Sequence, residues 1–216
     1  MGPAAPDCLW LRGALGGAEL AELDRIAGEE GRPGGRIGWT DPAVAGALSP
    51  VTALIRRHAL PGAALVRVVW FSKDAGANWG VPWHQDRVIA VADRHEAPGF
   101  GAWSRKAGIW HCEPPLAILE QMRFVRVHLD DCDAENGAME IARGSQAAGP
   151  VAMAEAARIA AHYPNELCAA RRGDVQVLPM LVLHRSLPAA TQAPRRALRL
   201  DFAAAALPAP LAWLAV

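Results

Sequence analysis

The sequence has no excess of charge of either sign, no paired cysteines and no long uninterrupted apolar run. Lysine plus arginine and aspartate plus glutamate both count 22, so the formal net charge is zero. A balanced chain lacks the basic field that nucleic-acid binding usually requires. We therefore expect no nucleic-acid partner, and no segment implies a protein partner.

The four cysteines are scattered, and the lack of a Cys-x-x-Cys pair argues against a zinc ribbon or a dithiol redox motif. The longest apolar stretch, residues 202–216, is interrupted by Pro208 and Pro210 and is shorter than the roughly 20 residues of a membrane helix. The first ten residues show no basic stretch followed by an apolar run, as a secretory signal would. These features predict a cytoplasmic protein with reduced thiols and no membrane partner.

Length and composition favour a single globular domain over residues 1–216, because the chain is 52% hydrophobic, 20% charged and short for two cores. Apolar periodicity predicts helices at residues 17–30, 42–59, 116–121 and 153–161. Short strands are expected at residues 65–72, 81–91, 124–130, 138–142, 167–171, 175–178, 182–184 and 197–202. Early helices and later strands predict a mainly β fold with flanking helices, in which the helices pack on a β-sandwich or jelly roll.

Two glycine-containing segments are predicted to be loops. Residues 31–38 have neither the lysine nor the preceding strand of a phosphate-binding loop. Residues 93–115 form a long loop, which in a compact domain is usually a lid or a binding segment. Trp103, Trp110 and His111 in this loop combine apolar surface with a polar atom, which suits a small ligand of mixed polarity. Packing of the loop onto the domain explains these three side chains equally well.

The segment Trp83-His84-Gln85-Asp86 carries the strongest chemical signal. On a strand, His84 and Asp86 would point to one face while Gln85 points away. An imidazole and a carboxylate side by side supply two of the three ligands of a facial triad, which holds Fe(II) and leaves positions open for substrate and O2. The pair alone is a weak signal, because it arises by chance in chains of this size.

His184, Ser186 and Arg195 provide the other candidate groups. His184 closes an apolar stretch and is the expected third ligand, although a structural histidine at a strand end fits the same pattern. Arg195 could present its planar fork to a carboxylate, and Ser186 could donate a second hydrogen bond from the face of His184. Because Arg196 and Arg199 are close in sequence, a solvated charge is the alternative for Arg195.

The order His84-x-Asp86, His184 and Arg195 resembles the phytanoyl-CoA dioxygenase family of 2-oxoglutarate oxygenases. Further segments agree with that family: Phe71-Ser72-Lys73, Asn78-Trp79, His128-Leu129-Asp130-Asp131, Glu135-Asn136-Gly137-Ala138-Met139-Glu140 and Gly144-Ser145. The resemblance spans residues 9–202, and its motifs are specific only in combination. The family usually has Gly-Ser-His where this chain has Gln146 in the third position; that histidine is not a metal ligand.

The resemblance implies a double-stranded β-helix, a cupin-like jelly roll, that oxidises a small organic molecule with Fe(II), 2-oxoglutarate and O2, most simply by hydroxylation. It implies that the two histidines and the aspartate bind iron, and that Arg195 takes the distal carboxylate of 2-oxoglutarate with help from Ser186. Lys73 and Asn78 precede the metal motif and are expected to border the co-substrate.

Two other interpretations stay open at this point. A cupin-like metalloenzyme could use the same triad with another metal and would need neither Arg195 nor 2-oxoglutarate. A non-catalytic binding protein on the same fold would be expected to have an incomplete triad. The intact carboxylate of Asp86 argues against halogenation, since related halogenases have a small residue there that leaves room for chloride.

Overall fold

The structure is a computed structural model that describes residues 8–28, 32–73, 78–191, 193 and 195–216. The strands are β1 (Leu9–Leu11), β2 (Gly34–Arg36), β3 (Ala64–Lys73), β4 (Val81–His84), β5 (Ile89–Val91), β6 (Gly101–Lys106), β7 (Ile109–Glu113), β8 (Met122–His128), β9 (Met139–Ala142), β10 (Asn165–Leu167), β11 (Val175–Pro179), β12 (His184–Ser186) and β13 (Arg195–Ala203). The helices are α1 (Gly17–Ile26), α2 (Pro42–His58), α3 (Leu116–Glu120) and α4 (Ala156–Ala160), with 3-10 turns at Ser145–Ala148 and Met153–Glu155.

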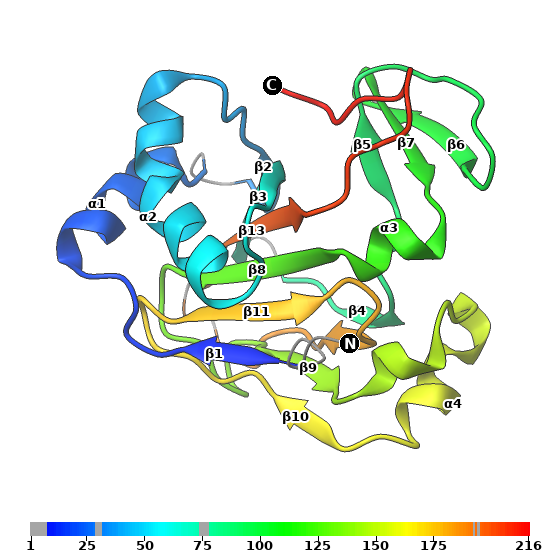
Figure 1. The fold of residues 1–216 in the computed structure, drawn as a ribbon. Coiled ribbons are helices and arrows are strands. Elements are labelled where there is room, and N and C mark those ends of the chain that lie inside the picture. The colour runs from blue at the N-terminus through cyan, green and yellow to red at the C-terminus, as the bar shows by residue number, and fades with distance from the viewer. Residues whose placement is uncertain (1–7, 29–31, 74–77, 192, 194) are drawn as a thin grey trace.

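Two antiparallel sheets form the double-stranded β-helix that the resemblance implies (Figure 1). The larger sheet has the strand order β1-β11-β8-β13-β3-β2, and the smaller has the order β10-β9-β12-β4. A third sheet, β5-β7-β6, lies beyond one end of them. The predicted mainly β fold with flanking helices is therefore confirmed.

Helices α1 and α2 cover the outer face of the larger sheet (Figure 1). The Asp41 carboxylate caps α2 by accepting hydrogen bonds from the amides of Ala43 and Val44. Leu23 of α1 and Val51 of α2 are fully buried against alternate residues of the sheet. This packing fixes which side of each strand faces the helices and which faces the interior of the β-helix.

The inner face of the larger sheet carries an unusual number of cations for a barrel interior. Alternation along β3 turns Arg67 and Lys73 inward, and alternation along β13 does the same for Arg195 and Arg199. Arg126 of β8 lies directly opposite Arg199 in the register of the sheet. The strand pattern therefore places positive charge inside the barrel, where the site is found.

The prediction that residues 93–115 form a loop is wrong, because most of this segment forms the hairpin β6–β7. Ala107 and Gly108 link the two strands, and both have positive φ angles, +48° and +81°. Such a two-residue turn matches the twist of a hairpin. Likewise, part of the predicted loop at residues 31–38 forms β2, which pairs with β3.

Several boundaries also differ from the sequence-based expectations. The predicted strand at residues 81–91 is two strands, β4 and β5, and β12 begins rather than ends at His184. The predicted strand at residues 167–171 is instead β10, which ends at Leu167. Helix α1 ends at Ile26, and the last two residues of its predicted range lie outside the described part of the chain.

All four cysteines are buried and free. No helix in the described segments has the length and apolar character needed to cross a membrane.

We expect Leu200→Ala to lower the free energy of unfolding by about 2–5 kcal/mol, because Leu200 is fully buried between β13 and the helices. Leu167→Ala is the matched control, since this strand leucine is 41% exposed, and it should cost less than about 1 kcal/mol. Urea denaturation of both variants measures the difference. Equal losses of unfolding free energy in the two variants would contradict the assignment of the layer between the larger sheet and helices α1 and α2 as a main core.

Candidate metal centre

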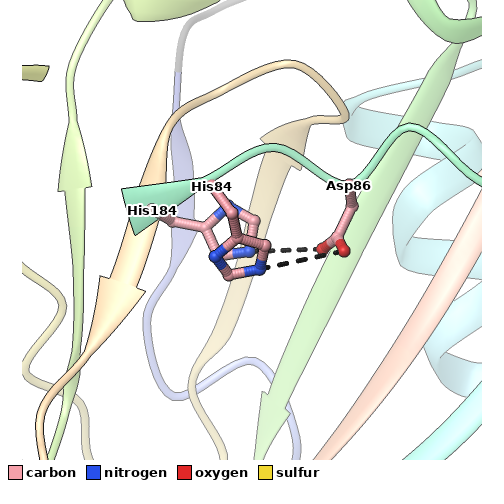
Figure 2. Close-up of side chains that lie close together, drawn as sticks. All are labelled: His84, Asp86 and His184. Carbon is pink, nitrogen blue, oxygen red and sulfur yellow. Dashed lines mark ion pairs between the residues drawn. The ribbon is translucent and has the colours of Figure 1, made fainter. Parts of the chain in front are cut away.

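Two histidines that are distant in sequence lie side by side because β4 pairs with β12. In the antiparallel register His84 is directly opposite His184, and their ring centroids are 4.2 Å apart. Figure 2 shows the two imidazole rings overlapping, with the Asp86 carboxylate facing their nitrogens. The smaller sheet therefore supplies two nitrogen donors to one point inside the barrel.

Asp86 completes this group from the segment after β4 rather than from a strand. Its carboxylate oxygens lie 3.9 Å from Nε2 of His84 and 3.2 Å from Nε2 of His184. The predicted convergence of His84 and Asp86 is confirmed, although strand alternation is not its cause. Gln85 points away and fixes the turn, since its side-chain amide donates to the carbonyls of Gly149 at 2.9 Å and Leu181 at 2.7 Å.

Both imidazoles have the tautomer that a metal requires. Nδ1 of His84 donates to the carbonyl of Pro82 at 2.8 Å, and Nδ1 of His184 donates to the carbonyl of Val182 at 3.0 Å. Nε2 of each ring is therefore the nitrogen that faces Asp86 and that a metal would bind. Burial and the neighbouring His184 lower the pKa of His84, which favours the neutral, ligating form.

The donor set fits a divalent transition metal. One ligand atom from each of His84, Asp86 and His184 lies within 4.8 Å of the others, so the three can converge on one ion. Two imidazoles and one carboxylate on one side of an open cavity are the donors that non-haem Fe(II) takes. These three residues could hold the metal and leave its other face to ligands in the cavity.

Arg199, which sequence analysis did not identify, orients the carboxylate of the group. Its guanidinium contacts Oδ2 of Asp86 through Nη1 and donates from Nε to Oδ1 of Asp201 at 2.7 Å. Burial disfavours the ionised form of Asp86, but the charge of Arg199 and the contacts with His184 and Arg199 together outweigh burial and hold the pKa of Asp86 well below the usual range. Asp86 is therefore an ionised ligand at all physiological pH values.

The metal group opens onto a cavity of about 210 Å³ inside the barrel. Its lining comes from the larger sheet, the smaller sheet and the segments on either side of β4. The lining residues are Arg67, Phe71, Lys73, Trp79, Val81, His84, Asp86, Phe124, Arg126, Met139, His184, Arg185, Ser186, Arg195 and Arg199. The cavity thus contains the predicted metal group together with Lys73, Ser186 and Arg195.

One side of the cavity is formed by cations without acidic partners. Lys73 lies directly opposite Arg195 in the register of β3 and β13, and Arg126 is their neighbour. Within the described residues, no carboxylate forms an ion pair with any of the three, and the buried Nε atoms of Arg126 and Arg195 have no hydrogen-bond partner. Burial, followed by the charges of Arg195 and Arg126, lowers the pKa of Lys73 to about 8. Like charges opposite each other on a sheet are destabilising, so this arrangement fits an anionic ligand.

Ser186 and Asn78 lie near this cationic group in different ways. The Ser186 hydroxyl lines the cavity and accepts a hydrogen bond from Nζ of Lys73 at 3.4 Å. Asn78 does not line it; its amide nitrogen donates to the carbonyl of Ala189 at 2.8 Å, and its oxygen accepts from the amide of Ala189 at 2.7 Å. Both polar atoms of Asn78 are therefore engaged with the backbone of the segment after β12.

Trp103, Trp110 and His111 are outside the lining of this cavity in the described structure, so the expectation that they line the pocket is not met. Trp103 and Trp110 meet edge to face on β6 and β7, with ring centroids 6.5 Å apart, and pack against the core. This is the packing role that the sequence left open. His111 is buried and accepts a hydrogen bond from Arg36, which lies on β2.

Sequence reasoning missed the inward cations Arg67, Arg126 and Arg199. The available signal was period-two alternation of charged residues with apolar ones along strands whose other face is strongly apolar. Trp79 was quoted only as part of a motif, yet its ring lines the cavity, 5.3 Å from Nζ of Lys73.

Comparison with known proteins gives the family. The model of the phytanoyl-CoA dioxygenase (PhyH) family matches residues 39–197. This chain belongs to the PhyH family. That membership places it among the non-haem iron, 2-oxoglutarate-dependent dioxygenases, with Fe(II) as cofactor and 2-oxoglutarate and O2 as co-substrates. A search of curated proteins gave no match.

Several solved structures have the same fold. AviO1 from Streptomyces viridochromogenes Tue57 has 19% identity and a TM-score of 0.65 over 96% of this chain and 94% of its own. HygX from Streptomyces hygroscopicus, with nickel and 2-oxoglutarate bound, has 17% identity and a TM-score of 0.58 over 92% and 83%. The α-ketoglutarate-dependent epimerase SnoN from nogalamycin biosynthesis has 14% identity and a TM-score of 0.60 over 92% and 78%. At these identities the likeness shows the fold alone.

We expect Arg199→Lys to weaken binding of Fe(II), or of Co(II) as its spectroscopic substitute, by about 10–100-fold. Lysine keeps the positive charge but cannot hold Asp86 and Asp201 together as the planar guanidinium does. Arg185→Lys is the control, because Arg185 lines the same cavity but pairs with Glu140. Titration with Co(II), followed by absorbance, measures the affinities. An unchanged metal affinity in Arg199→Lys would show that Arg199 does not orient Asp86 for metal binding.

Proposed function

We propose that this PhyH-family chain hydroxylates a C–H bond of a small organic molecule while 2-oxoglutarate is converted to succinate and CO2. The observation that carries the proposal is that the His84, Asp86 and His184 group lines the same open cavity as a set of cations without acidic partners. A metal-binding group alone would fit many metalloenzymes. The adjoining cations specifically favour a dicarboxylate co-substrate that reaches from the metal to Arg195.

Each group has a defined task in this proposal. His84, Asp86 and His184 hold Fe(II), which when bound supplies the electrons for O2 activation coupled to decarboxylation of 2-oxoglutarate. Arg195 binds the distal carboxylate in bidentate fashion, and Lys73 adds a second positive charge. Ser186 donates its hydroxyl to the same carboxylate. The buried position of these groups orients the co-substrate and excludes bulk water from the ionic contacts.

Asp86 also favours hydroxylation over halogenation, because its carboxylate takes the position that a halide would need. One oxygen atom of O2 enters the product and the other enters succinate. Relatives of similar fold include an epimerase and a carbocyclase, so product analysis with ¹⁸O2 is the direct test of oxygen insertion. A product that contains ¹⁸O supports hydroxylation, and one without ¹⁸O would replace it with a hydrogen-abstraction reaction that inserts no oxygen.

The proposal treats the whole chain as one catalytic domain that acts in the cytoplasm on a small molecule. Four free, buried cysteines fit a reducing compartment. The six-stranded sheet draws on both ends of the described chain, from β1 to β13, which supports a single folding unit.

The substrate need not be known to test the co-substrate reaction. With Fe(II), 2-oxoglutarate and O2, we expect the protein to form succinate slowly, as detected by proton NMR. Asp86→Ala should reduce succinate to the level seen without added iron. Asp93→Ala, at an exposed site, is the control. Undiminished succinate formation by Asp86→Ala would overturn the metal assignment.

The affinity for 2-oxoglutarate should fall as pH rises through about 8, the pKa of Lys73. Below that value the ammonium attracts the distal carboxylate, and above it the neutral amine does not. Lys73→Arg, which stays charged, should bind 2-oxoglutarate with a flat profile between pH 7 and 9. Isothermal titration calorimetry with the Zn(II)-loaded proteins measures both profiles. A parallel fall in both proteins would place the titrating group elsewhere.

A further inference from the structure

A second group of cations lies at the opposite end of β3 from Lys73. Arg67 and Lys73 are six residues apart on the inner face of this strand, so their backbones are separated by about 20 Å. Arg36 joins Arg67 from the neighbouring strand, where it lies opposite Val69. One carboxylate cannot reach both ends. The Arg36–Arg67 pair is therefore a separate cationic group from that formed by Lys73 and Arg195.

The Arg36–Arg67 pair lacks an anion of its own. Nη1 of Arg36 and Nε of Arg67 are buried and have no hydrogen-bond partner. The acidic group beside Arg67 is Asp201, at 3.6 Å, and Asp201 is already bound more closely to Arg199, at 2.7 Å. Arg36 donates to Nε2 of His111 at 3.0 Å, which makes that imidazole an acceptor. Burial, followed by the charge of Arg67, lowers the pKa of Arg36, and the charge of Asp201 offsets only part of this effect.

The charge of the whole cavity leads to the same conclusion. Six cationic side chains line it: Arg67, Lys73, Arg126, Arg185, Arg195 and Arg199. Three carboxylates line it or pair with these cations: Asp86, Glu140 and Asp201. Fe(II) and the 2-oxoglutarate dianion cancel each other, so their binding leaves the excess of three positive charges unchanged. Unpaired charge in a partly desolvated cavity is costly, and a further anion would relieve it.

We propose that the substrate carries an oxyanion, a carboxylate or a phosphate, that binds Arg67 of the cavity lining and the neighbouring Arg36, while its reacting carbon faces the metal group. This inference rests on the proposed function. The geometry separates the two anion sites: the co-substrate occupies the end with Lys73 and Arg195, and the substrate occupies the end with Arg67. The planar forks of two arginines suit the oxygens of such a group. His111 acts as a positioning residue, because it holds the guanidinium of Arg36.

The test uses the protein loaded with Zn(II) and saturated with 2-oxoglutarate, so that the other anion site is filled. Inorganic phosphate and butyrate are the two probes, and isothermal titration calorimetry measures their binding. We expect saturable binding of at least one probe, weakened about tenfold or more in Arg36→Gln and in Arg67→Gln. The tighter probe distinguishes a phosphorylated substrate from a carboxylic acid. Arg158→Gln is the control, because this exposed arginine pairs with Glu155 on its own helical turn, away from the cavity lining.

Three results distinguish failure of the substrate anion site from failure of the proposed function. Loss of probe binding in both Arg36→Gln and Arg67→Gln, with unchanged 2-oxoglutarate affinity and thermal melting, supports the anion site. If the protein binds 2-oxoglutarate but phosphate and butyrate bind equally well, or not at all, to wild type and to Arg67→Gln, the anion site is overturned and the proposed function stands. Failure of the Zn(II) protein to bind 2-oxoglutarate overturns the proposed function and the substrate site with it. Arg67→Lys, which keeps the charge, checks that any loss is not caused by misfolding, since it should retain part of the binding.

Discussion

The antiparallel pairing of β4 with β12 is the constraint on which the rest of the site depends. It places His84 opposite His184 across one hundred residues of sequence and turns both Nε2 atoms toward the same point. Asp86 follows within two residues, and Gln85 anchors the intervening turn to the backbone of two distant segments. A slip of one residue in this register would move one imidazole to the outer face of the sheet and destroy the group. The metal centre is therefore a product of strand register rather than of any local motif.

Positive charge inside the barrel is the second organising feature. Lys73 opposes Arg195, and Arg126 opposes Arg199, so two pairs of like charges face each other across neighbouring strands. Such pairs lower stability unless something negative lies between them. Asp201 compensates Arg199 from within the protein, whereas the others are left for ligands. These pairs therefore destabilise the ligand-free protein and favour the binding of anions. Local arrangements that lower stability in this way are typical of functional sites.

The sequence was sufficient to predict the groups that carry the chemistry but not the shape around them. His84, Asp86, His184 and Arg195 converge as their spacing and the family resemblance indicated. The hairpin at residues 101–113 was missed, because the turn at Ala107 and Gly108 has the composition of an open loop. The inward arginines were missed because a charged residue on a strand is normally solvent-facing. Inward and outward charges differ only in what the opposite face of the strand packs against, and the tertiary structure decides that.

Arg195 and Arg196, adjacent on β13, show this difference between inward and outward charges. Arg196 also supplies the control for the most direct measurement. Arg196 points outward to Asp130 and Asp24, whereas Arg195 points inward to the cavity. The measurement is an anaerobic titration of the metal-free protein with Fe(II) and then 2-oxoglutarate, followed by its visible spectrum. We predict a weak charge-transfer band that appears only with both components, persists in Arg196→Gln and is lost in Arg195→Gln. A protein that binds one Fe(II) but gives no band with 2-oxoglutarate would contradict the account.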